Sequence, residues 1–172
     1  GYIASFNGAT GAHLNKTYIG TSEYDQGFIL ETDVDGDVYV TGQTLGSYPV
    51  VNATYVDASS AQFIHKISDD LTTTIYSTVF GSSSLSGPPP SHAINISPTA
   101  FLVDDCENVY VSGWGGGFNG AGSSGAYNPY AGGSTNGMPL TGDAQQATTD
   151  GSDFYFFVME KDATGILYGT YF

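Results

Sequence analysis

An internal repeat constrains this chain more than any other feature, because a sequence that repeats one unit builds one local structure several times. The segment 63–81 reads FIHKISDDLTTTIYSTVFG. It aligns without gaps with the segment 2–20, which lies 61 residues earlier, and with the segment 155–172, which begins 92 residues later. All three copies place two apolar runs on either side of a polar turn. They predict three strand–turn–strand units.

A second unit occurs twice. Asp33–Gly42 aligns with Asp104–Gly113, 71 residues further on. The offset of 92 exceeds this offset of 71 by 21, which places a 21-residue insertion between Gly113 and Tyr155. The surrounding segment, near 114–153, is rich in Gly, Ser and Asn, and this composition is typical of a long surface loop.

The two units together predict an all-β fold, a β-propeller-like array of four-stranded antiparallel blades. Alternation places Phe63, His65 and Ile67 on one face of a strand, while Val38–Val40 carries large groups on both faces, as expected for a strand between two layers. The predicted strands lie near 28–32, 37–43, 62–67 and 73–80, and near 100–104, 108–114, 154–160 and 166–172.

The repeat also predicts the domain organisation. Residues 1–20 would be the last two strands of a preceding blade, residues 21–81 a complete blade, and residues 82–172 a second complete blade that carries the insertion. A closed propeller needs at least about four blades, so about 2.5 blades cannot cover their own terminal faces. We therefore expect a fragment of a larger chain, completed by the rest of the same propeller or by neighbouring chains.

The run DGDVYVTG at 35–42, followed by FIHK at 63–66 and IYSTVFG at 75–81, resembles the bacterial seven-bladed β-propeller (SBBP-type) repeat. The stretch 103–116, VDDCENVYVSGWGG, is similar to the version found in gliding-motility-associated surface proteins that leave the cell by type IX secretion. The resemblance covers the chain outside the insertion and implies a secreted or cell-surface protein. It implies no single activity, because the family is defined by its sequence and fold.

The charge balance excludes some partners. Lys and Arg total 3 against 17 Asp and Glu, so the formal net charge is −14. Nucleic acid and anionic lipid are bound through basic side chains, so neither is an expected partner. No apolar run is long enough to predict membrane insertion.

The acidic turn Asp33-x-Asp35-Gly36-Asp37 is the one candidate metal site. Carboxylates at alternate positions supply the oxygen ligands that Ca²⁺ prefers, but the spacing departs from an EF-hand loop. The alternative, which we favour, is a β-turn in which Asp caps backbone groups and Gly takes positive φ. Calcium is the only cofactor that the sequence suggests.

No residue pattern indicates catalysis. The three histidines, His13, His65 and His92, have no metal-ligand spacing, and His65 aligns with apolar residues of the other copies, which favours a packing role. The single cysteine, Cys106, indicates a small turn or core residue rather than a reactive thiol. The glycine-rich run 113–120 lacks the Lys-Ser or Lys-Thr pair of a phosphate loop. We therefore expect no enzyme in this chain.

The insertion carries aromatic residues that could contact a protein or glycan at the cell surface: Trp114, Phe118, Tyr127 and Tyr130. The alternative is a loop that covers a blade edge. The expected function is a structural scaffold or adhesive, protein-interaction surface. A carbohydrate-binding propeller is the second hypothesis, and a propeller hydrolase with its active site outside this chain is the third.

Overall fold

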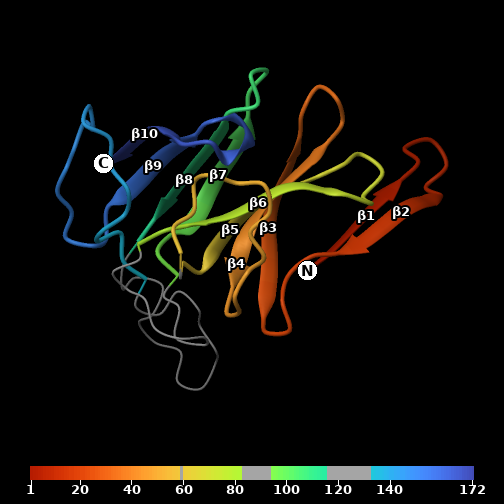
Figure 1. The fold of residues 1–172 in the computed structure, drawn as a ribbon, viewed down its shortest axis with the longest axis horizontal. Coiled ribbons are helices and arrows are strands. Elements are labelled where there is room, and N and C mark those ends of the chain that lie inside the picture. Colours follow the sequence, from red (N-terminus) through yellow and green to blue (C-terminus); the bar gives the residue numbers. More distant parts are fainter. Residues whose placement is uncertain (59, 83–93, 116–132) are drawn as a thin grey trace.

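Three antiparallel β-sheets lie side by side in the computed structural model, which describes residues 1–58, 60–82, 94–115 and 133–172 (Figure 1). A two-stranded sheet is followed by two four-stranded sheets, and the strands of each follow one another in chain order. The strands are β1 (Tyr2–Phe6), β2 (His13–Tyr18), β3 (Asp25–Thr32), β4 (Val38–Thr44), β5 (Gln62–Ile67), β6 (Thr74–Phe80), β7 (Ser97–Val103), β8 (Val109–Trp114), β9 (Phe154–Met159) and β10 (Ile166–Tyr171). A short 3₁₀ turn, η3 (Lys161–Ala163), precedes β10.

The all-β prediction is confirmed, and every predicted strand is present within three residues of its expected ends. The largest differences are in the first strands of the four-stranded sheets. β3 and β7 each begin three residues earlier than predicted, and they contain Gly27 and Pro98, which disfavour strands. Both residues lie beside a β-bulge at equivalent places in the repeat, on strands at the edge of their sheet, where proline is tolerated.

Each four-stranded sheet has two different faces. We call one the tyrosine face; it carries Tyr39, Ile64, Tyr76 and Phe80 in the β3–β6 sheet and, at the equivalent repeat positions, Tyr110, Phe156, Tyr168 and Phe172 in the β7–β10 sheet. We call the other the valine face; it carries Val38, Val40, Phe63, Ile67 and Val79 in the β3–β6 sheet and Val109, Val111, Tyr155, Met159 and Tyr171 in the β7–β10 sheet. Both sets follow from the alternation of side chains along a strand.

The sheets stack in one direction. The tyrosine face of β3–β6 packs on the valine face of β7–β10 to form the larger core, in which the rings of Phe80 and Phe157 stack with centroids 5.4 Å apart. The valine face of β3–β6 packs on the β1–β2 hairpin through Ile3 and Ile19. These two residues are the repeat equivalents of Ile64 and Phe80, so the hairpin also uses its tyrosine-face positions. The same stacking rule therefore holds at both junctions.

Two further contacts fix the two four-stranded sheets together. β3 and β7, the first strands of the two sheets, lie against each other. The connection between β4 and β5 reaches the neighbouring sheet, where the backbone N–H groups of Thr54 and Tyr55 donate to the carbonyl of Ala163 at 3.1 and 2.7 Å. The β3–β6 sheet is consequently covered on both faces, and this explains why its central strands carry large groups on both sides.

Candidate functional site at the junction of the two sheets

Each four-stranded sheet contains the same acidic turn between its first and second strands. Oδ1 of Asp33 accepts hydrogen bonds from the backbone N–H groups of Asp35 and Asp37 at 3.1 and 2.9 Å. Oδ1 of Asp104 accepts the equivalent bonds from Cys106 and Asn108 at 2.9 and 2.8 Å. In both turns one carboxylate oxygen therefore satisfies two backbone donors, which is the local chemistry of an Asx turn.

The two turns differ at the position that needs a left-handed backbone. Gly36 has φ 89° in the first turn, and Glu107 has φ 65° at the equivalent place in the second. Glycine adopts this conformation without a steric penalty, whereas a residue with a Cβ pays for it. A strained glutamate at a glycine position points to a specific task for its side chain.

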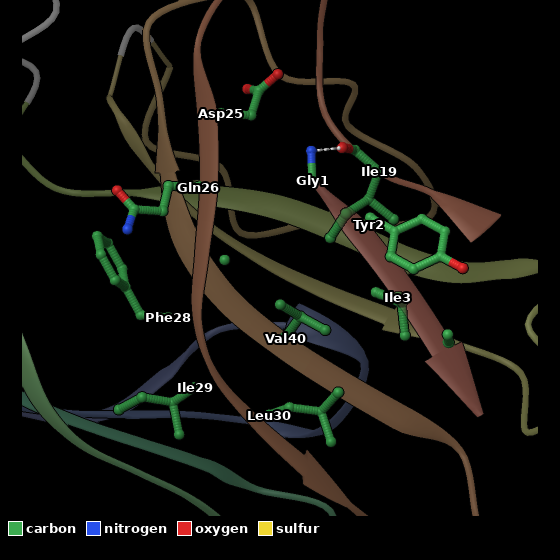
Figure 2. Close-up of a pocket in the computed structure, with 12 residues that line it drawn as sticks. Gly1, Tyr2, Ile3, Ile19, Asp25, Gln26, Phe28, Ile29, Leu30 and Val40 are labelled. Carbon is green, nitrogen blue, oxygen red and sulfur yellow. Dashed lines mark hydrogen bonds between the residues drawn. The ribbon is translucent and has the colours of Figure 1, made fainter. Parts of the chain in front are cut away.

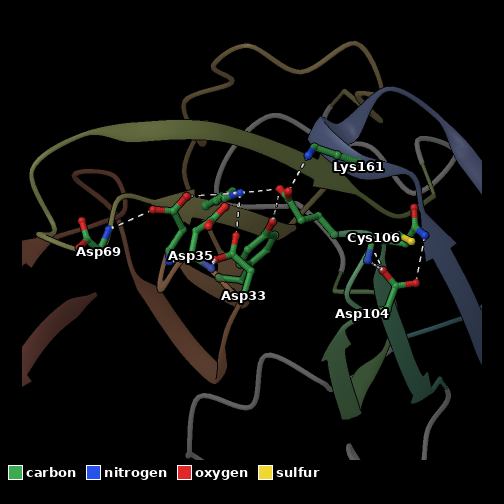
Figure 3. Close-up of polar contacts among 11 residues, drawn as sticks. Asp33, Asp35, Asp69, Asp104, Cys106 and Lys161 are labelled. Carbon is green, nitrogen blue, oxygen red and sulfur yellow. Dashed lines mark hydrogen bonds and ion pairs between the residues drawn. The ribbon is translucent and has the colours of Figure 1, made fainter.

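The Glu107 carboxylate pairs with two lysines, Lys66 across the junction and Lys161, which is labelled in Figure 3. Oε2 lies 2.7 Å from Nζ of Lys66, which projects from β5 of the other sheet, and Oε1 binds Lys161 of η3. The Lys66 ammonium also lies 2.9 Å from Oδ2 of Asp33 and 3.5 Å from Oδ2 of Asp37. The first acidic turn therefore supplies two carboxylates to Lys66, and the second turn supplies the third.

The network is buried on the Lys66 side. The side chains of Lys66 and Asp33 are 6% and 1% exposed, and the ammonium lies 4.9 Å from the ring centre of Tyr39. Burial by itself would lower the pKa of Lys66, but hydrogen bonds to Glu107, Tyr39 and Asp33 outweigh it and hold that pKa above its ordinary value. Hydrogen bonds from Lys161 and Lys66 lower the pKa of Glu107 to about 2. Lys66 and Glu107 are thus both charged at neutral pH.

The structure shows where the predicted calcium ligands lie, namely Asp33, Asp35 and Asp37. Asp33 and Asp37 direct one oxygen each to the Lys66 ammonium, and Asp35 is exposed in the turn. Among the residues that the structure describes, no group of three or more His, Cys, Asp or Glu side chains is arranged to hold a metal ion. The cation that these carboxylates meet is a lysine, and calcium binding remains a prediction that we test below.

His65 occupies the valine face of β5, as expected from the strand alternation. Its Nδ1 lies 2.8 Å from the Tyr48 hydroxyl oxygen and its Nε2 lies 2.9 Å from Oγ1 of Thr74. Burial lowers the pKa of His65 to about 4. This is a core histidine with both ring nitrogens engaged. Cys106 is exposed in the second acidic turn, and His92 lies outside the described residues.

Of the four predicted partner-contact residues, the structure describes one, Trp114. Trp114 ends β8 on the tyrosine face, is 43% exposed, and meets the ring of Phe154 edge to face with centroids 5.8 Å apart. A pocket of about 360 Å³ lies against these two rings, Gly115 and Ser152. Phe118, Tyr127 and Tyr130 lie outside the described residues.

A larger pocket, of about 480 Å³, lies between the hairpin and the next sheet (Figure 2). β1 forms one wall, and the chain from Asp25 to Leu30 with Val40 forms the other. Among the described strands, β1 pairs only with β2, and its residues Tyr2, Ile3 and Ala4 line this pocket. In the β3–β6 sheet the equivalent strand, β5, also pairs with β4. Relative to the hairpin, the pocket therefore lies on the side where β5 of the four-stranded sheet has its neighbour β4.

Sequence reasoning did not identify the ionic network. Lys66, Glu107 and Lys161 are far apart in the chain, and no local spacing connects them. Two signals were present: two of these residues are among only 3 basic residues of the chain, and Glu107 replaces a glycine of the repeat. A charged residue within an apolar strand and a bulky residue at a turn glycine are both departures that call for a partner.

Within the part of the chain that the structure describes, no helix has the length and apolar character needed to cross a membrane. Comparison with known proteins gives no further assignment, because no family model and no curated protein matches the chain.

Proposed function

We propose that this chain is a non-enzymatic, propeller-like repeat module that acts as a rigid scaffold and presents an interaction surface outside the cell. The observation that carries the proposal is the stacking rule. Two successive junctions place the tyrosine-face positions of one unit on the valine face of the next. A chain that repeats one junction builds a scaffold whose geometry is set by nearest neighbours.

The propeller-like arrangement is supported by two features of the sheets. Each complete unit is a four-stranded antiparallel meander, the form of a propeller blade. The first strands β3 and β7 lie against each other while the hairpin and the sheets spread apart, so the units are arranged as a fan (Figure 1). A fan of this kind closes into a ring when further blades are added.

The proposed location rests on the resemblance to surface-protein repeats and on the acidic composition. A formal net charge of −14 favours solubility and repels anionic partners. Detection of the protein on intact source cells with a specific antibody tests the location, and labelling that requires cell rupture would contradict it.

Hydrogen exchange tests the scaffold. Ile64 is fully buried in the junction of the two four-stranded sheets, so Ile64→Val should cost about 1 kcal/mol. Because the junction couples the sheets, we expect lower protection of amides in β8 and β9 as well as in β4 and β5. Val34→Ala is the control, since Val34 is 75% exposed in a turn. Loss of protection confined to the first sheet would reject a coupled scaffold.

A second candidate function, carbohydrate binding, is favoured by one observation. Trp114 and Phe154 present two exposed rings beside a pocket, and exposed aromatic rings of this kind offer an apolar platform for a partner. Screening the protein on a glycan array tests this candidate. Trp114→Ala should abolish any signal, whereas Phe6→Ala, which removes an exposed ring at the other end of the molecule, should retain it.

A further inference from the structure

One histidine stands where the other copies of the repeat carry apolar residues. His65 lies on the valine face of β5 and is 8% exposed, and its equivalents are Ala4 in the hairpin and Phe157 in the second four-stranded sheet. The same strand position therefore accepts an alanine or a phenylalanine. A buried polar ring costs stability unless it is bonded, so a histidine at this position points to a property that an apolar residue lacks.

Two neutral hydroxyl groups hold the His65 ring. Nδ1 lies 2.8 Å from the Tyr48 hydroxyl oxygen, and Nε2 lies 2.9 Å from Oγ1 of Thr74. In a neutral ring one nitrogen donates and the other accepts, and a hydroxyl group suits either role. A protonated ring donates at both nitrogens, so the hydroxyl that donates to the neutral ring would have to turn its hydrogen away. Neither hydroxyl supplies a negative charge to offset a buried imidazolium.

The neighbours of His65 on the valine face are uncharged in the part of the chain that the structure describes. They are Val40 and Ser77 directly opposite it on β4 and β6, Thr74, Tyr48, and Ile3 and Ile19 of the hairpin. Lys66 follows His65 in β5 and lies on the other face. Asp25 acts on the Tyr48 hydroxyl, but for His65 burial is the cause that lowers the pKa to about 4. The charged ring is therefore disfavoured where it sits.

The groups around His65 also hold the connection between β4 and β5. Tyr48 belongs to this connection. Ser77, directly opposite His65, donates from its hydroxyl to the carbonyl of Pro49 at 2.7 Å and exchanges backbone hydrogen bonds with Val51. The first part of the connection is thus fixed at His65 and along β6, and its later part docks on the second sheet.

We propose that His65 is an acid-sensitive switch that holds the connection between β4 and β5 at neutral pH and releases it as the surroundings become acidic. A proton binds the ring readily only when the ring reaches water, so proton uptake favours the opened form. Because the connection also docks on the second sheet, its release removes one of the contacts between the two sheets. The switch goes beyond the proposed scaffold, since it adds a condition under which the scaffold loosens.

The pKa of His65 sets the direction and the size of the effect. It is lowered from 6.5 to about 4, so the opened form binds a proton in a range where the closed form does not. The closed form therefore loses stability as the pH falls through 6.5. Between pH 7 and pH 5 the ratio of closed to opened protein should fall about 20-fold. Glu107, whose pKa is lowered from 4.5 to about 2, changes little over this range.

Hydrogen exchange of the intact chain at pH 7 and pH 5, corrected for the intrinsic effect of pH on exchange, tests the switch. The reporters are the amides of Val51 and Asp57, which donate to carbonyls of β6. Their protection factors should fall about 20-fold at pH 5 in the wild type. His65→Phe, which installs the residue of the third copy, should retain its protection at pH 5. His13→Asn changes an exposed histidine and should behave as the wild type does.

An NMR titration of the His65 ring in the wild type needs no substitution, and it should give a pKa of about 4. A ring that titrates near 6.5 while the protein stays folded would overturn the proposal. A His65→Phe protein that loses as much protection at pH 5 as the wild type would also overturn it, as would an equal loss throughout both sheets. None of these results touches the scaffold, because the Ile64→Val experiment measures the coupling of the sheets at neutral pH.

Discussion

The two acidic turns have one backbone design and two uses. In the turn that begins at Asp33, glycine takes the left-handed position and the free carboxylate oxygen points to Lys66. In the turn that begins at Asp104, the free oxygen accepts hydrogen bonds from Asn108 and Tyr110 within its own sheet, and Glu107 takes the left-handed position. The comparison separates what the turn needs, a capping aspartate, from what the junction needs, a carboxylate that reaches the neighbouring sheet.

Removing Lys66 should have the largest effect. Lys66→Met leaves the carboxylates of Asp33 and Asp37 without a cation, and breaking a buried ionic group of this kind costs about 3–5 kcal/mol. The measurement is the free energy of unfolding in urea at pH 7. Lys161→Met is the matched control, because Lys161 is 50% exposed and its loss should cost less than about 1 kcal/mol. Equal effects of the two substitutions would contradict a buried network centred on Lys66.

Glu107→Gln should cost about 2 kcal/mol at pH 7, since it removes the charge from hydrogen bonds to two lysines. The cost should depend on pH. The pKa of Glu107 is lowered from 4.5 to about 2 in the folded protein, so its contribution is present above pH 4.5 and is lost as the pH falls toward 2.

Unfolding curves of the wild type and Glu107→Gln from pH 7 to pH 2 check this dependence, and the two proteins should converge at the acid end. The exposed Glu23→Gln serves as the control and should run parallel to the wild type. A difference that stays constant across the range would show that the Glu107 charge does not act through the lysines.

Gly36→Ala should cost about 1 kcal/mol, the penalty of placing a Cβ at a left-handed position. The cost is conformational, because the added Cβ would meet its nearest neighbour, Cβ of Asp69, at an ordinary 3.6 Å. Thermal unfolding monitored by circular dichroism measures it. Glu107→Gly is the reciprocal substitution: it relieves the same strain while losing the ion pairs, so it should cost less than Glu107→Gln. If Glu107→Gly is less stable than Glu107→Gln, backbone strain at position 107 does not contribute measurably to the difference between the two turns.

Calcium should have the smallest effect. Two carboxylates of the first turn already contact the Lys66 ammonium, so we expect no change in the melting temperature between a chelator and millimolar Ca²⁺. Lys66→Met sharpens the test, because removing the ammonium frees those oxygens. A calcium-dependent rise in the wild-type melting temperature would support a metal at Asp33, Asp35 and Asp37.

Most of the fold could be predicted from the sequence, because the strands follow from the alternation of side chains and their grouping into sheets follows from the repeat. The face shared by Phe63, His65 and Ile67 followed from a period of two residues, and the strand ends followed from turn residues. The early starts of β3 and β7 escaped prediction because Gly27 and Pro98 read as strand breakers, although bulged edge strands accept both.

Only the turns of the candidate site could be predicted from the sequence, and the ion pairs between the sheets could not. The capping aspartates Asp33 and Asp104 belong to a local motif, and the turn geometry agrees with the favoured interpretation. The partners of the network come from two sheets. Lys66 and Glu107 are separated by 41 positions in the sequence, and Glu107 and Lys161 by 54. Such contacts depend on which face of one sheet meets which face of the next, and no pattern within one repeat contains that information.

The glutamate at position 107 also makes the repeats non-interchangeable. If the two four-stranded units exchanged places, Gly36 would face Val158 across the junction, and Lys66 would no longer face Glu107. Such an exchange would keep the strands and their apolar faces, because both units carry apolar residues at equivalent positions. The exchange would remove the pairing of Lys66 with Glu107, so this one ion pair favours the observed order of the two units.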